Sequence, residues 1–561
     1  MKRQLTVLTA ALILLSGCTE DDPEDATGAT SAPASTSCPR ELDTSLSAWA
    51  VAGFSGSIAV STGGATDCLA AYGSADDRTP NSIDTTFSIG SITKAFTAAT
   101  VYHLADDGKL KLDDMAGDLL PELKGPVRAA TVHQLLLHTS GLKGTHGNDT
   151  QPMSEKEALK AIGKLELAAQ PGKKYLYSNA GYTLLALIVE RVSGSGYRDY
   201  LKSEILPLPD GRTAGGFWNG QPAAPGPRAV GYRDDGTADD AGEFSGPYWA
   251  VEGNGGLAMT TAELATWTHA LFTGKIVSAA STRAIATPGR DIGEGRSEAP
   301  GWVAYDTSLY GEPLLATAGG GGDIGHNAVV VWLPRRQRVI AMASNKPKIS
   351  AEELLQAVGP AMVAGKPLPV PRAQASKADL DAVVGTYQLG AGGSLTATVR
   401  DDRLAITAVG ADAVAAIFPP PAGVPGSQLR AHEEMVGKLL AGETQEGRKE
   451  RAAFEKQIGP MGKVTFLGSI AHGGEIRTYV SVLSSGKPVL GWFALNEEGG
   501  VEAAEVPTKE HPTLQFLPSG DNRYHPDDPT GVRPDVSVGF AKDRMTVNGP
   551  NGATTSAQRV G

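Results

Sequence analysis

The stretch Phe87-Ser88-Ile89-Gly90-Ser91-Ile92-Thr93-Lys94 places a serine hydroxyl and a lysine amine three positions apart at the start of an apolar segment. Side chains at i and i+3 share a face of a helix, so Ser91 and Lys94 are expected to lie together. The residues up to Leu104 leave almost no polar face, which predicts a buried helix. A serine hydroxyl becomes a good nucleophile only when a neighbouring group accepts its proton. Ser91 is therefore the candidate nucleophile, with Lys94 as its neighbouring amine.

A second segment, Tyr177-Ser178-Asn179, places a phenol and an amide just before another apolar helix. A free phenol titrates near ~10, so it accepts a proton at neutral pH only where something stabilises the phenolate. A lysine cation within ~4 to 6 Å would do so. We therefore expect a proton route from Ser91 to Tyr177, with Lys94 coupled electrostatically to both. Spacing alone leaves open which group holds the proton.

Two further segments follow the same order along the chain: Leu137-His138-Thr139-Ser140-Gly141-Leu142 lies between the first two, and Gly253-Asn254-Gly255-Gly256-Leu257 comes after them. With the Ser-x-x-Lys element, residues 45 to 365 resemble the serine β-lactamase and penicillin-binding-protein superfamily. The similar branch contains class C β-lactamases, D-aminopeptidases and family VIII carboxylesterases.

The resemblance implies an α+β fold with an antiparallel sheet flanked by helices. It also implies that Ser91 is acylated and that Tyr177 is the general base, with Asn179 beside it. His138 is interpreted as a structural cap that holds the pocket wall. Members of this family act on esters, amides and peptides, so a small-molecule or peptide substrate is expected.

The chain departs from the family at the third motif, where relatives carry Lys-Thr-Gly, His-x-Gly or Trp-Gly-Gly. Here the usual cationic or aromatic residue falls on Gly319 or Gly320 within Thr317-Ala318-Gly319-Gly320-Gly321-Gly322-Asp323-Ile324-Gly325-His326. Glycine allows close backbone approach. A backbone amide between residues 320 and 323 (Gly320, Gly321, Gly322, Asp323) could form the oxyanion hole with that of Ser91. The missing cation favours a substrate without a carboxylate. His326 is a candidate for replacing part of the role of that cation in substrate binding.

Three functions therefore compete. The first is a hydrolase of small carboxylic esters or D-amino-acid amides, and the second is a cell-wall D-alanyl peptidase or β-lactamase. The third is a catalytically silent envelope lipoprotein that uses the fold for binding. Retention of Ser91, Lys94, Tyr177 and Asn179 favours an enzyme, and the glycine run favours the first over the second.

The amino terminus predicts export. Lys2-Arg3 precede an apolar run from Leu5 to Leu15 that is too short for a stable membrane span, which is typical of a signal peptide over residues 1–17. Leu15-Ser16-Gly17-Cys18 resembles a bacterial lipobox, which implies lipidation of Cys18, a membrane anchor and a protein facing the periplasm. Residues 18–44 are expected to be a flexible tether. Cys38 and Cys68 then remain as a pair in an oxidising compartment, which predicts a disulfide.

The composition and motifs of the chain argue against several classes of function. The 561 residues exceed one typical domain, and 50 basic against 62 acidic residues give a net charge of −12, which disfavours nucleic-acid binding. Metal-ligand spacings, a Gly-x-Ser-x-Gly elbow and a phosphate-binding loop are missing from the sequence. We therefore expect no metal and no cofactor, and the oligomeric state stays open.

The character of the chain changes after Pro367-Leu368-Pro369-Val370-Pro371, which predicts that the hydrolase domain over 45–365 is followed by a linker over 366–378. Alternating apolar residues in 379–426 and 507–561 predict a small β-barrel that resembles the lipocalin-like barrels appended to such hydrolases. Residues 427–506 read as an inserted α+β module, with a helix over 431–457 followed by strands. This module is distantly similar to the nuclear-transport-factor-type fold.

Overall fold

The computed structural model describes residues 38–149, 151–218, 226–233, 238, 246–321, 325–346, 348–371, 380–400, 403–420, 425–472, 475–495, 499–508, 511–520, 522–528 and 535–560. Cys18, the predicted lipidation site, lies outside these residues, as do Gly322 and Asp323.

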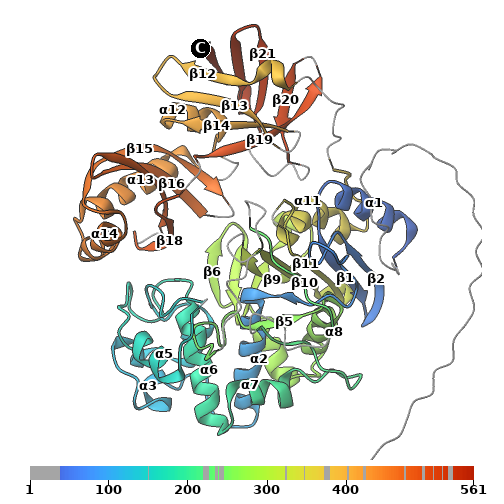
Figure 1. Cartoon of the computed structure of the whole chain (residues 1–561). Coiled ribbons are helices and arrows are strands. Elements are labelled where there is room, and N and C mark those ends of the chain that lie inside the picture. Colours follow the sequence, from blue (N-terminus) through green and yellow to red (C-terminus); the bar gives the residue numbers. More distant parts are fainter. Residues whose placement is uncertain are drawn as a thin grey trace, which may run out of the picture. The chain divides into compact units, whose positions relative to one another are not determined.

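An antiparallel sheet of eight strands organises the part of the chain that carries the serine motif (Figure 1). Its order is β2-β1-β11-β10-β9-β8-β7-β6. The bounds are β1 Gly56–Thr62, β2 Ala65–Tyr72, β6 Arg290–Gly293, β7 Arg296–Ala299, β8 Trp302–Tyr305, β9 Leu314–Gly321, β10 His326–Leu333 and β11 Arg338–Ser344. Strand β1 pairs with β11, so the hairpin of β1 and β2 and the hairpin of β10 and β11 join in one sheet.

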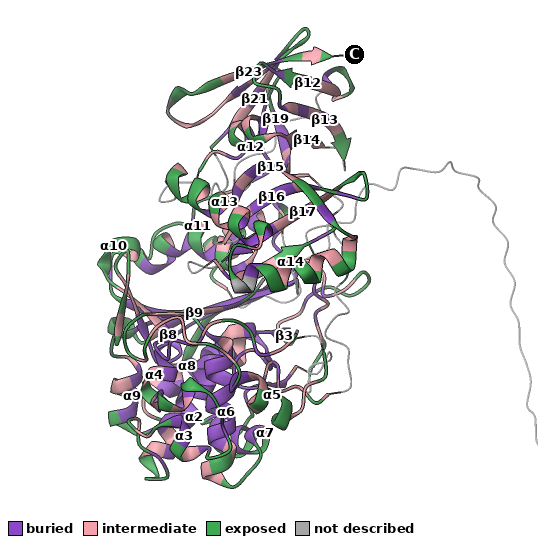
Figure 2. Ribbon diagram, turned by 90° about the vertical axis from the view of Figure 1, so that its left-hand side faces the viewer, coloured by how far each residue is buried: buried purple, intermediate pink, exposed green. Residues whose placement is uncertain are grey.

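Helices cover both faces of this sheet. On one face lie α1 (Arg40–Val51) and α11 (Ala351–Ala364), which share a core with the sheet. On the other face lie α2 (Thr93–Asp106), α6 (Asn179–Ser193) and α8 (Thr261–Phe272). Figure 2 shows α2 and α6 buried along most of their length, because both are apolar on nearly every side. The fold is therefore the predicted α+β arrangement.

Shorter elements complete this part. The helices are α3 (Ala116–Leu119), α4 (Val132–Leu136), α5 (Glu155–Ile162), α7 (Tyr197–Tyr200), α9 (Ala279–Ile285) and α10 (Thr307–Tyr310). A small sheet of order β3-β5-β4 joins β3 (Phe87–Ser88), β4 (Gly216–Phe217) and β5 (Leu257–Met259). This small sheet brings the segment after Asn254 against the segment that leads into Ser91.

The predicted disulfide between Cys38 and Cys68 is confirmed. It ties the segment before α1 to strand β2 and closes a sequence separation of 30 residues. The buried Cys68 side chain belongs to the core on the α1 side of the sheet.

The carboxyl-terminal part contains a closed eight-stranded barrel, as predicted. Its strands are β12 (Gly385–Leu389), β13 (Ser394–Arg400), β14 (Arg403–Val409), β19 (Thr513–Gly520), β20 (Arg523–Pro526), β21 (Ser537–Ala541), β22 (Arg544–Asn548) and β23 (Thr554–Val560). The barrel closes because β12 pairs with β23, and β14 pairs directly with β19 across the intervening residues. A short helix, α12 (Ala411–Ile417), follows β14.

The intervening residues form an α+β unit with its own apolar core. It consists of α13 (Gly426–Ala441), α14 (Gln445–Ile458) and a sheet of β15 (Met461–His472), β16 (Glu475–Ser484), β17 (Lys487–Leu495) and β18 (Val501–Glu505). The helical segment predicted over 431–457 is present as two helices rather than one, because Gly442 ends α13 in a left-handed conformation (φ +70°). The domain limits drawn from the sequence remain predictions.

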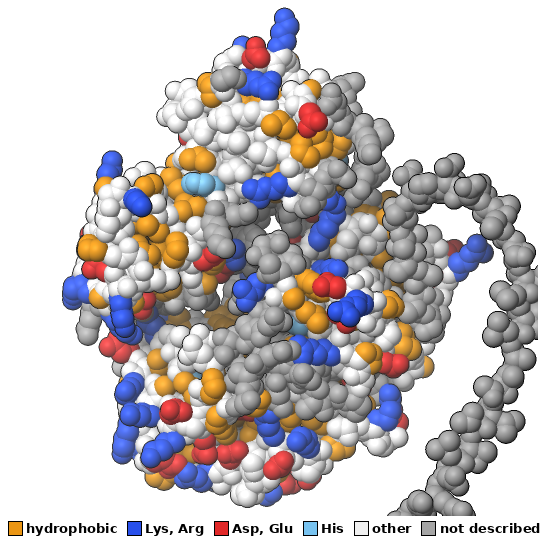
Figure 3. Space-filling view, in the orientation of Figure 1, with side chains coloured by type: hydrophobic (Ala, Val, Ile, Leu, Met, Phe, Trp, Pro, Cys, Tyr) orange, Lys and Arg blue, Asp and Glu red, His pale blue; other side chains and the backbone are white. Residues whose placement is uncertain are grey.

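Charged side chains are mixed on the surface. On the face shown in Figure 3, the described basic and acidic side chains are interspersed rather than separated by sign. None of the helices in the described ranges combines the length and apolar character needed to cross a membrane.

Candidate active site

The candidate nucleophile lies in a single 3-10 turn, Gly90–Ile92, between β3 and α2. The turn is held on the small sheet because the Ile89 amide donates a hydrogen bond to the Leu257 carbonyl at 3.1 Å. Gly90 has a φ of +48°, which glycine adopts readily. Ser91 thus sits at the start of the buried helix α2, where its hydroxyl can meet side chains one turn further along.

Lys94 is buried, with 3% of its surface exposed. Its amine donates to Ser91 Oγ at 2.9 Å and to the carbonyl oxygen of Asn254 at 2.9 Å. The amine also lies 4.8 Å from the centre of the Tyr177 ring, a cation–π distance. The predicted pairing of Ser91 with Lys94 is therefore present, and the Asn254 carbonyl orients the amine.

Asn254 is held by its own side chain. Its amide nitrogen donates to Thr183 Oγ1 at 2.8 Å and to the Ala250 carbonyl at 2.9 Å. The turn packs on α6 closely enough that a Cβ at Gly253 would lie 2.5 Å from the Tyr182 carbonyl oxygen. Sequence reasoning assigned no role to Asn254, which acts through its backbone.

Tyr177 precedes α6 and is half exposed (50%). Its hydroxyl donates to Ser91 Oγ at 2.9 Å. The next residue, Ser178, caps α6 by accepting a hydrogen bond from the Gly181 amide at 3.1 Å. The cap sets where the helix begins, and Tyr177 thereby reaches the nucleophile as the sequence predicted.

Asn179 is the first residue of α6. Its amide oxygen is buried and has no hydrogen-bond partner within the described ranges. Buried polar atoms normally have a partner, so this oxygen has an unused capacity to accept a hydrogen bond. The substrate-binding role expected of Asn179 stays a prediction.

Strand β9 lies directly against the nucleophile turn. A Cβ at Gly319 would lie 2.2 Å from the Ser91 amide nitrogen, and one at Gly90 would lie 2.5 Å from the Gly320 amide nitrogen. Contacts this short exclude any side chain at these positions. The backbone of Gly319 and Gly320 therefore lies next to the nucleophile turn, where an oxyanion hole needs a second amide beside that of Ser91. Gly321 is the last residue of β9, one position further along the strand.

This geometry corrects one prediction. The usual cationic residue was expected to correspond to Gly319 or Gly320, but neither position has room for a side chain, since a Cβ at Gly320 would lie 2.0 Å from the His326 carbonyl oxygen. With Gly319, which lies against the Ser91 amide, taken as the glycine of Lys-Thr-Gly, the position of the cation falls on Thr317. Side chains two apart on a strand share a face, so Thr317 presents a neutral hydroxyl on the side of the nucleophile.

His326, in β10, is buried. Its ring lies 6.4 Å from the ring of Phe87 and 5.0 Å from that of Trp218, edge-on in both cases. These contacts agree with a packing role in the wall behind the nucleophile turn.

His138 and Glu298 form a buried pair behind Tyr177, with 2% and 4% of their surfaces exposed. Burial, and then the Lys94 cation, hold the pKa of His138 well below its usual range. Burial raises the pKa of Glu298 to about 8, although a hydrogen bond from Tyr175 and the Lys94 charge oppose this. Glu298 was missed from the sequence, where it stands in an unremarkable polar stretch.

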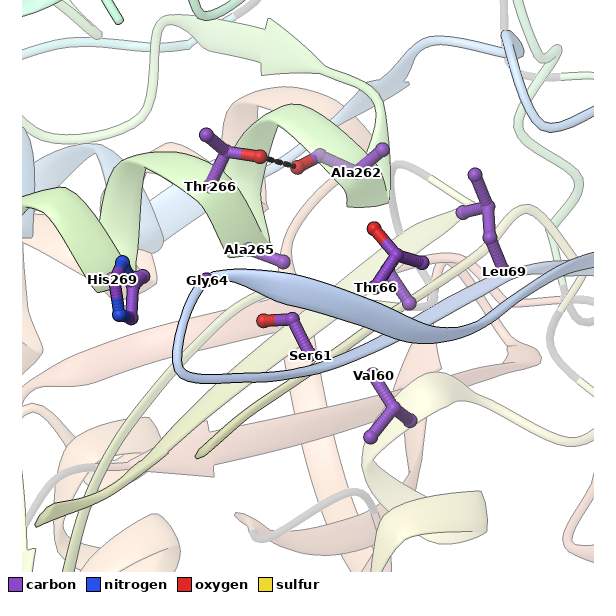
Figure 4. A pocket seen from close by; sticks show the side chains of 10 residues that line it. Val60, Ser61, Gly64, Thr66, Leu69, Ala262, Ala265, Thr266 and His269 are labelled. Atoms are coloured by element: carbon purple, nitrogen blue, oxygen red, sulfur yellow. Dashed lines mark hydrogen bonds between the residues drawn. The ribbon is translucent and has the colours of Figure 1, made fainter. Parts of the chain in front are cut away.

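A small cavity lies elsewhere in the fold, between β1, β2 and α8 (Figure 4). Its volume is about 40 Å³, and it is lined by Ser61, Thr66, Thr266 and His269 among others. Ser61 Oγ and His269 Nε2 are both buried without a hydrogen-bond partner in the described part of the chain. A space of this size is too small for a substrate, since ligand pockets usually measure about 300 to 1,000 Å³.

Comparison with known proteins identifies the family. A family model described as Beta-lactamase matches residues 50–359, which is more than half of the chain. The putative penicillin-binding protein PbpX of Bacillus subtilis (strain 168) is 31% identical over 267 residues, covering 47% of this chain and 67% of that protein. Another penicillin-binding protein of the same organism is 26% identical over 392 residues, covering 64% and 84%.

Solved structures agree on the fold. The octameric penicillin-binding protein homologue from Pyrococcus abyssi matches with a TM-score of 0.52 and 20% identity, over 85% of this chain and 99% of that one. Since the family model covers more than half of the chain, the chain belongs to the β-lactamase family of serine hydrolases.

Proposed function

We propose that this protein hydrolyses small carboxylic esters or D-amino-acid amides through an acyl-enzyme on Ser91. The observation that carries the proposal is that Ser91 Oγ lies 2.9 Å from both the Lys94 amine and the Tyr177 hydroxyl. The substrate class is supported by β9, which reads Leu-Leu-Ala-Thr-Ala-Gly-Gly-Gly and offers no cation to a substrate carboxylate. Thr317 instead offers a hydroxyl.

The geometry supports a two-step reaction. In the reacting form the Tyr177 oxygen accepts the Ser91 proton, while the Lys94 ammonium stabilises the negative charge on that oxygen. Ser91 Oγ attacks the substrate carbonyl, and the amides of Ser91 and Gly320 bind the oxyanion. The leaving alcohol or amine takes the proton from Tyr177. Water then attacks the acyl-enzyme, gives up a proton by the same route and releases the acid and free Ser91.

A cell-wall D-alanyl peptidase or β-lactamase is the second candidate, because both curated relatives are named as penicillin-binding proteins. Such substrates carry a carboxylate. In this alternative the carboxylate would have to be bound by hydrogen bonds alone, with the Thr317 hydroxyl as a donor. We rank it below the first function for that reason.

Intact-protein mass spectrometry separates these candidates. A soluble form that begins at Thr19, and so keeps both disulfide cysteines, is exposed to a fluorophosphonate and separately to benzylpenicillin, with Ser91→Ala as the control. A Ser91-dependent fluorophosphonate adduct without a penicillin adduct is expected. A stable penicillin adduct, or hydrolysis of a chromogenic cephalosporin, would reverse the ranking. No adduct with either reagent would refute acylation of Ser91.

We also propose that the protein is exported and anchored through a lipid on Cys18. The proposal rests on the amino-terminal sequence, and the disulfide between Cys38 and Cys68 supports it because disulfides persist in oxidising compartments. In a bacterial host, Cys18→Ala should release the protein from the membrane fraction and abolish incorporation of labelled palmitate. Unchanged membrane association and labelling would contradict it.

A further inference from the structure

A buried carboxyl group lies close to the catalytic lysine without belonging to the serine, lysine and tyrosine trio. Glu298 is on β7, and only 4% of its surface is exposed. Burying a carboxyl costs free energy unless other groups satisfy it. Its contacts are the hydroxyl of Tyr175, which forms a hydrogen bond with it, and His138, whose Nε2 lies 3.8 Å from Glu298 Oε1. Both contacts are with residues that neighbour Tyr177 in the active site.

The orientation of the His138 ring is set by the backbone. The Ser178 amide donates to His138 Nδ1 at 3.0 Å, so neutral imidazole carries its proton on Nε2, on the side of Glu298. His138 itself has a left-handed φ of +51°, which is uncommon for a non-glycine residue. Its carbonyl accepts a hydrogen bond from the Leu176 amide at 2.7 Å. Neighbouring backbone groups thus hold the ring in one place.

The His138 ring supports the general base. It stacks on the ring of Tyr177 with the centres 4.4 Å apart and the planes inclined by 30°. The ring of Tyr182 also packs against His138, with the ring centres 5.0 Å apart. Because Tyr177 is half exposed, the stack on His138 restricts how far its hydroxyl can move from Ser91.

Charge connects Glu298 to the same groups. The Lys94 cation acts on both Glu298 and His138, and lowers the pKa of each. A neutral Glu298 leaves the Lys94 charge available to the Tyr177 oxygen, whereas an ionised Glu298 offsets it. The titratable groups that contact Glu298 or interact with it electrostatically are Lys94, His138, Tyr175, Tyr182 and Tyr305. Tyr177 and Arg296 interact with Tyr175 beside it.

We propose that Glu298 is a positioning residue for the reaction: through His138 it holds Tyr177 against Ser91, and its ionisation weakens the site at alkaline pH by offsetting the Lys94 charge. The inference rests on the proposed acylation of Ser91.

The test is the rate constant for fluorophosphonate labelling of Ser91 as a function of pH, in wild type and Glu298→Gln. Glutamine keeps the shape and cannot ionise. Burial raises the pKa of Glu298 to about 8, so the carboxyl is mostly neutral at pH 7 and mostly ionised at pH 9. The ratio of the Glu298→Gln to the wild-type rate constant should therefore rise about tenfold between these two pH values. Taking the ratio removes titrations that both proteins share.

A matched control is Glu312→Gln, since Glu312 is also buried but pairs with Arg336 at 3.3 Å. Its ratio to wild type should stay flat. A flat ratio for Glu298→Gln would overturn the proposal while leaving Ser91 acylation intact, whereas a wild type that does not label at all would instead contradict the proposed function.

A second variant tests the positioning part and covers the case in which Glu298→Gln fails to fold. His138→Asn removes the ring while asparagine tolerates the left-handed backbone. Its kcat for an ester should fall at least about tenfold with KM changed less than about twofold, because the loss affects the transition state rather than substrate binding. Wild-type kcat in a folded His138→Asn protein would refute the role given to His138 and Glu298.

Discussion

At the scale of single residues, Lys94 makes the most consequential contacts in the site. It holds Ser91 Oγ and the Asn254 carbonyl at 2.9 Å each, and lies over the Tyr177 ring. Lys94→Met keeps the apolar stem and removes the charge, so kcat/KM for a nitrophenyl ester should fall by about 10² to 10⁴. The exposed Lys164→Met is the control and should match wild type. Full esterase activity in a folded Lys94→Met protein would remove Lys94 from the mechanism.

The sequence predicted the site residues whose side chains belong to a short local motif. It did not predict those that act through the backbone or that reach the site only through strand pairing. Ser91 and Lys94 follow from i, i+3 spacing on an apolar helix, and Tyr177 follows from a short motif before the next helix. Asn254 uses a backbone carbonyl, which any residue provides, so its identity carries no signal for that role. Glu298 lies in a four-residue strand whose pairing no local pattern determines.

At the scale of elements, the contact of β9 with the nucleophile turn is the critical one. Gly319→Ala would place a methyl group 2.2 Å from the Ser91 amide nitrogen, so the strand must move away from the oxyanion site. We expect a loss of stability of about 1–3 kcal/mol and a fall in kcat of at least about tenfold. Gly390→Ala is the control, because a Cβ there meets nothing within 4 Å. Unchanged kcat in Gly319→Ala would show that β9 does not complete the oxyanion hole.

The disulfide ties the segment before α1 to β2. We expect its removal to lower the stability of the fold without changing the reactivity of Ser91. Closing a 30-residue separation stabilises by ~3 kcal/mol in the chain-entropy account. A Cys38→Ala, Cys68→Ala double variant should therefore unfold at a lower temperature, while the rate of Ser91 labelling at 25 °C stays close to wild type. If neither the double substitution nor a reductant changes the unfolding temperature, the disulfide does not have the stabilising role assigned to it.

Helix starts were better predicted than helix interruptions, for a physical reason. The sequence patterns Ser154-x-x-Glu157 and Thr260-x-x-Glu263 predict capping boxes, and both boxes are present, since each joins two groups three residues apart. The break at Gly442 was missed because a glycine within a helical pattern is tolerated at a cost of about 1 kcal/mol. Strand β20 (Arg523–Pro526) was missed because it is short and ends in proline.

At the scale of the whole molecule, the sheet and the barrel were predictable as classes, but their closure was not. Alternating apolar residues indicate strands, whereas the pairing of β1 with β11, or of β12 with β23, joins residues far apart in the sequence. No local pattern specifies such a partner. The resemblance to a known family supplied the first pairing, and only the structure shows the register of the second.

The apolar cores predict how the chain divides. The two cores around the eight-stranded sheet contain described residues up to Leu368, and the cores of the carboxyl-terminal part begin at Val383. A chain of residues 19–371 keeps the first two cores complete, together with the disulfide and every residue assigned to the site. We expect it to unfold cooperatively and to label at Ser91 within about threefold of the full-length rate, since no core residue is lost.

Circular dichroism would establish whether the 19–371 protein folds, and fluorophosphonate labelling with Ser91→Ala as the blank would establish its reactivity. A folded 19–371 protein that fails to label would show that residues beyond 371 complete the active site. The barrel and the α+β unit would then be needed for the reaction rather than merely appended to the hydrolase domain.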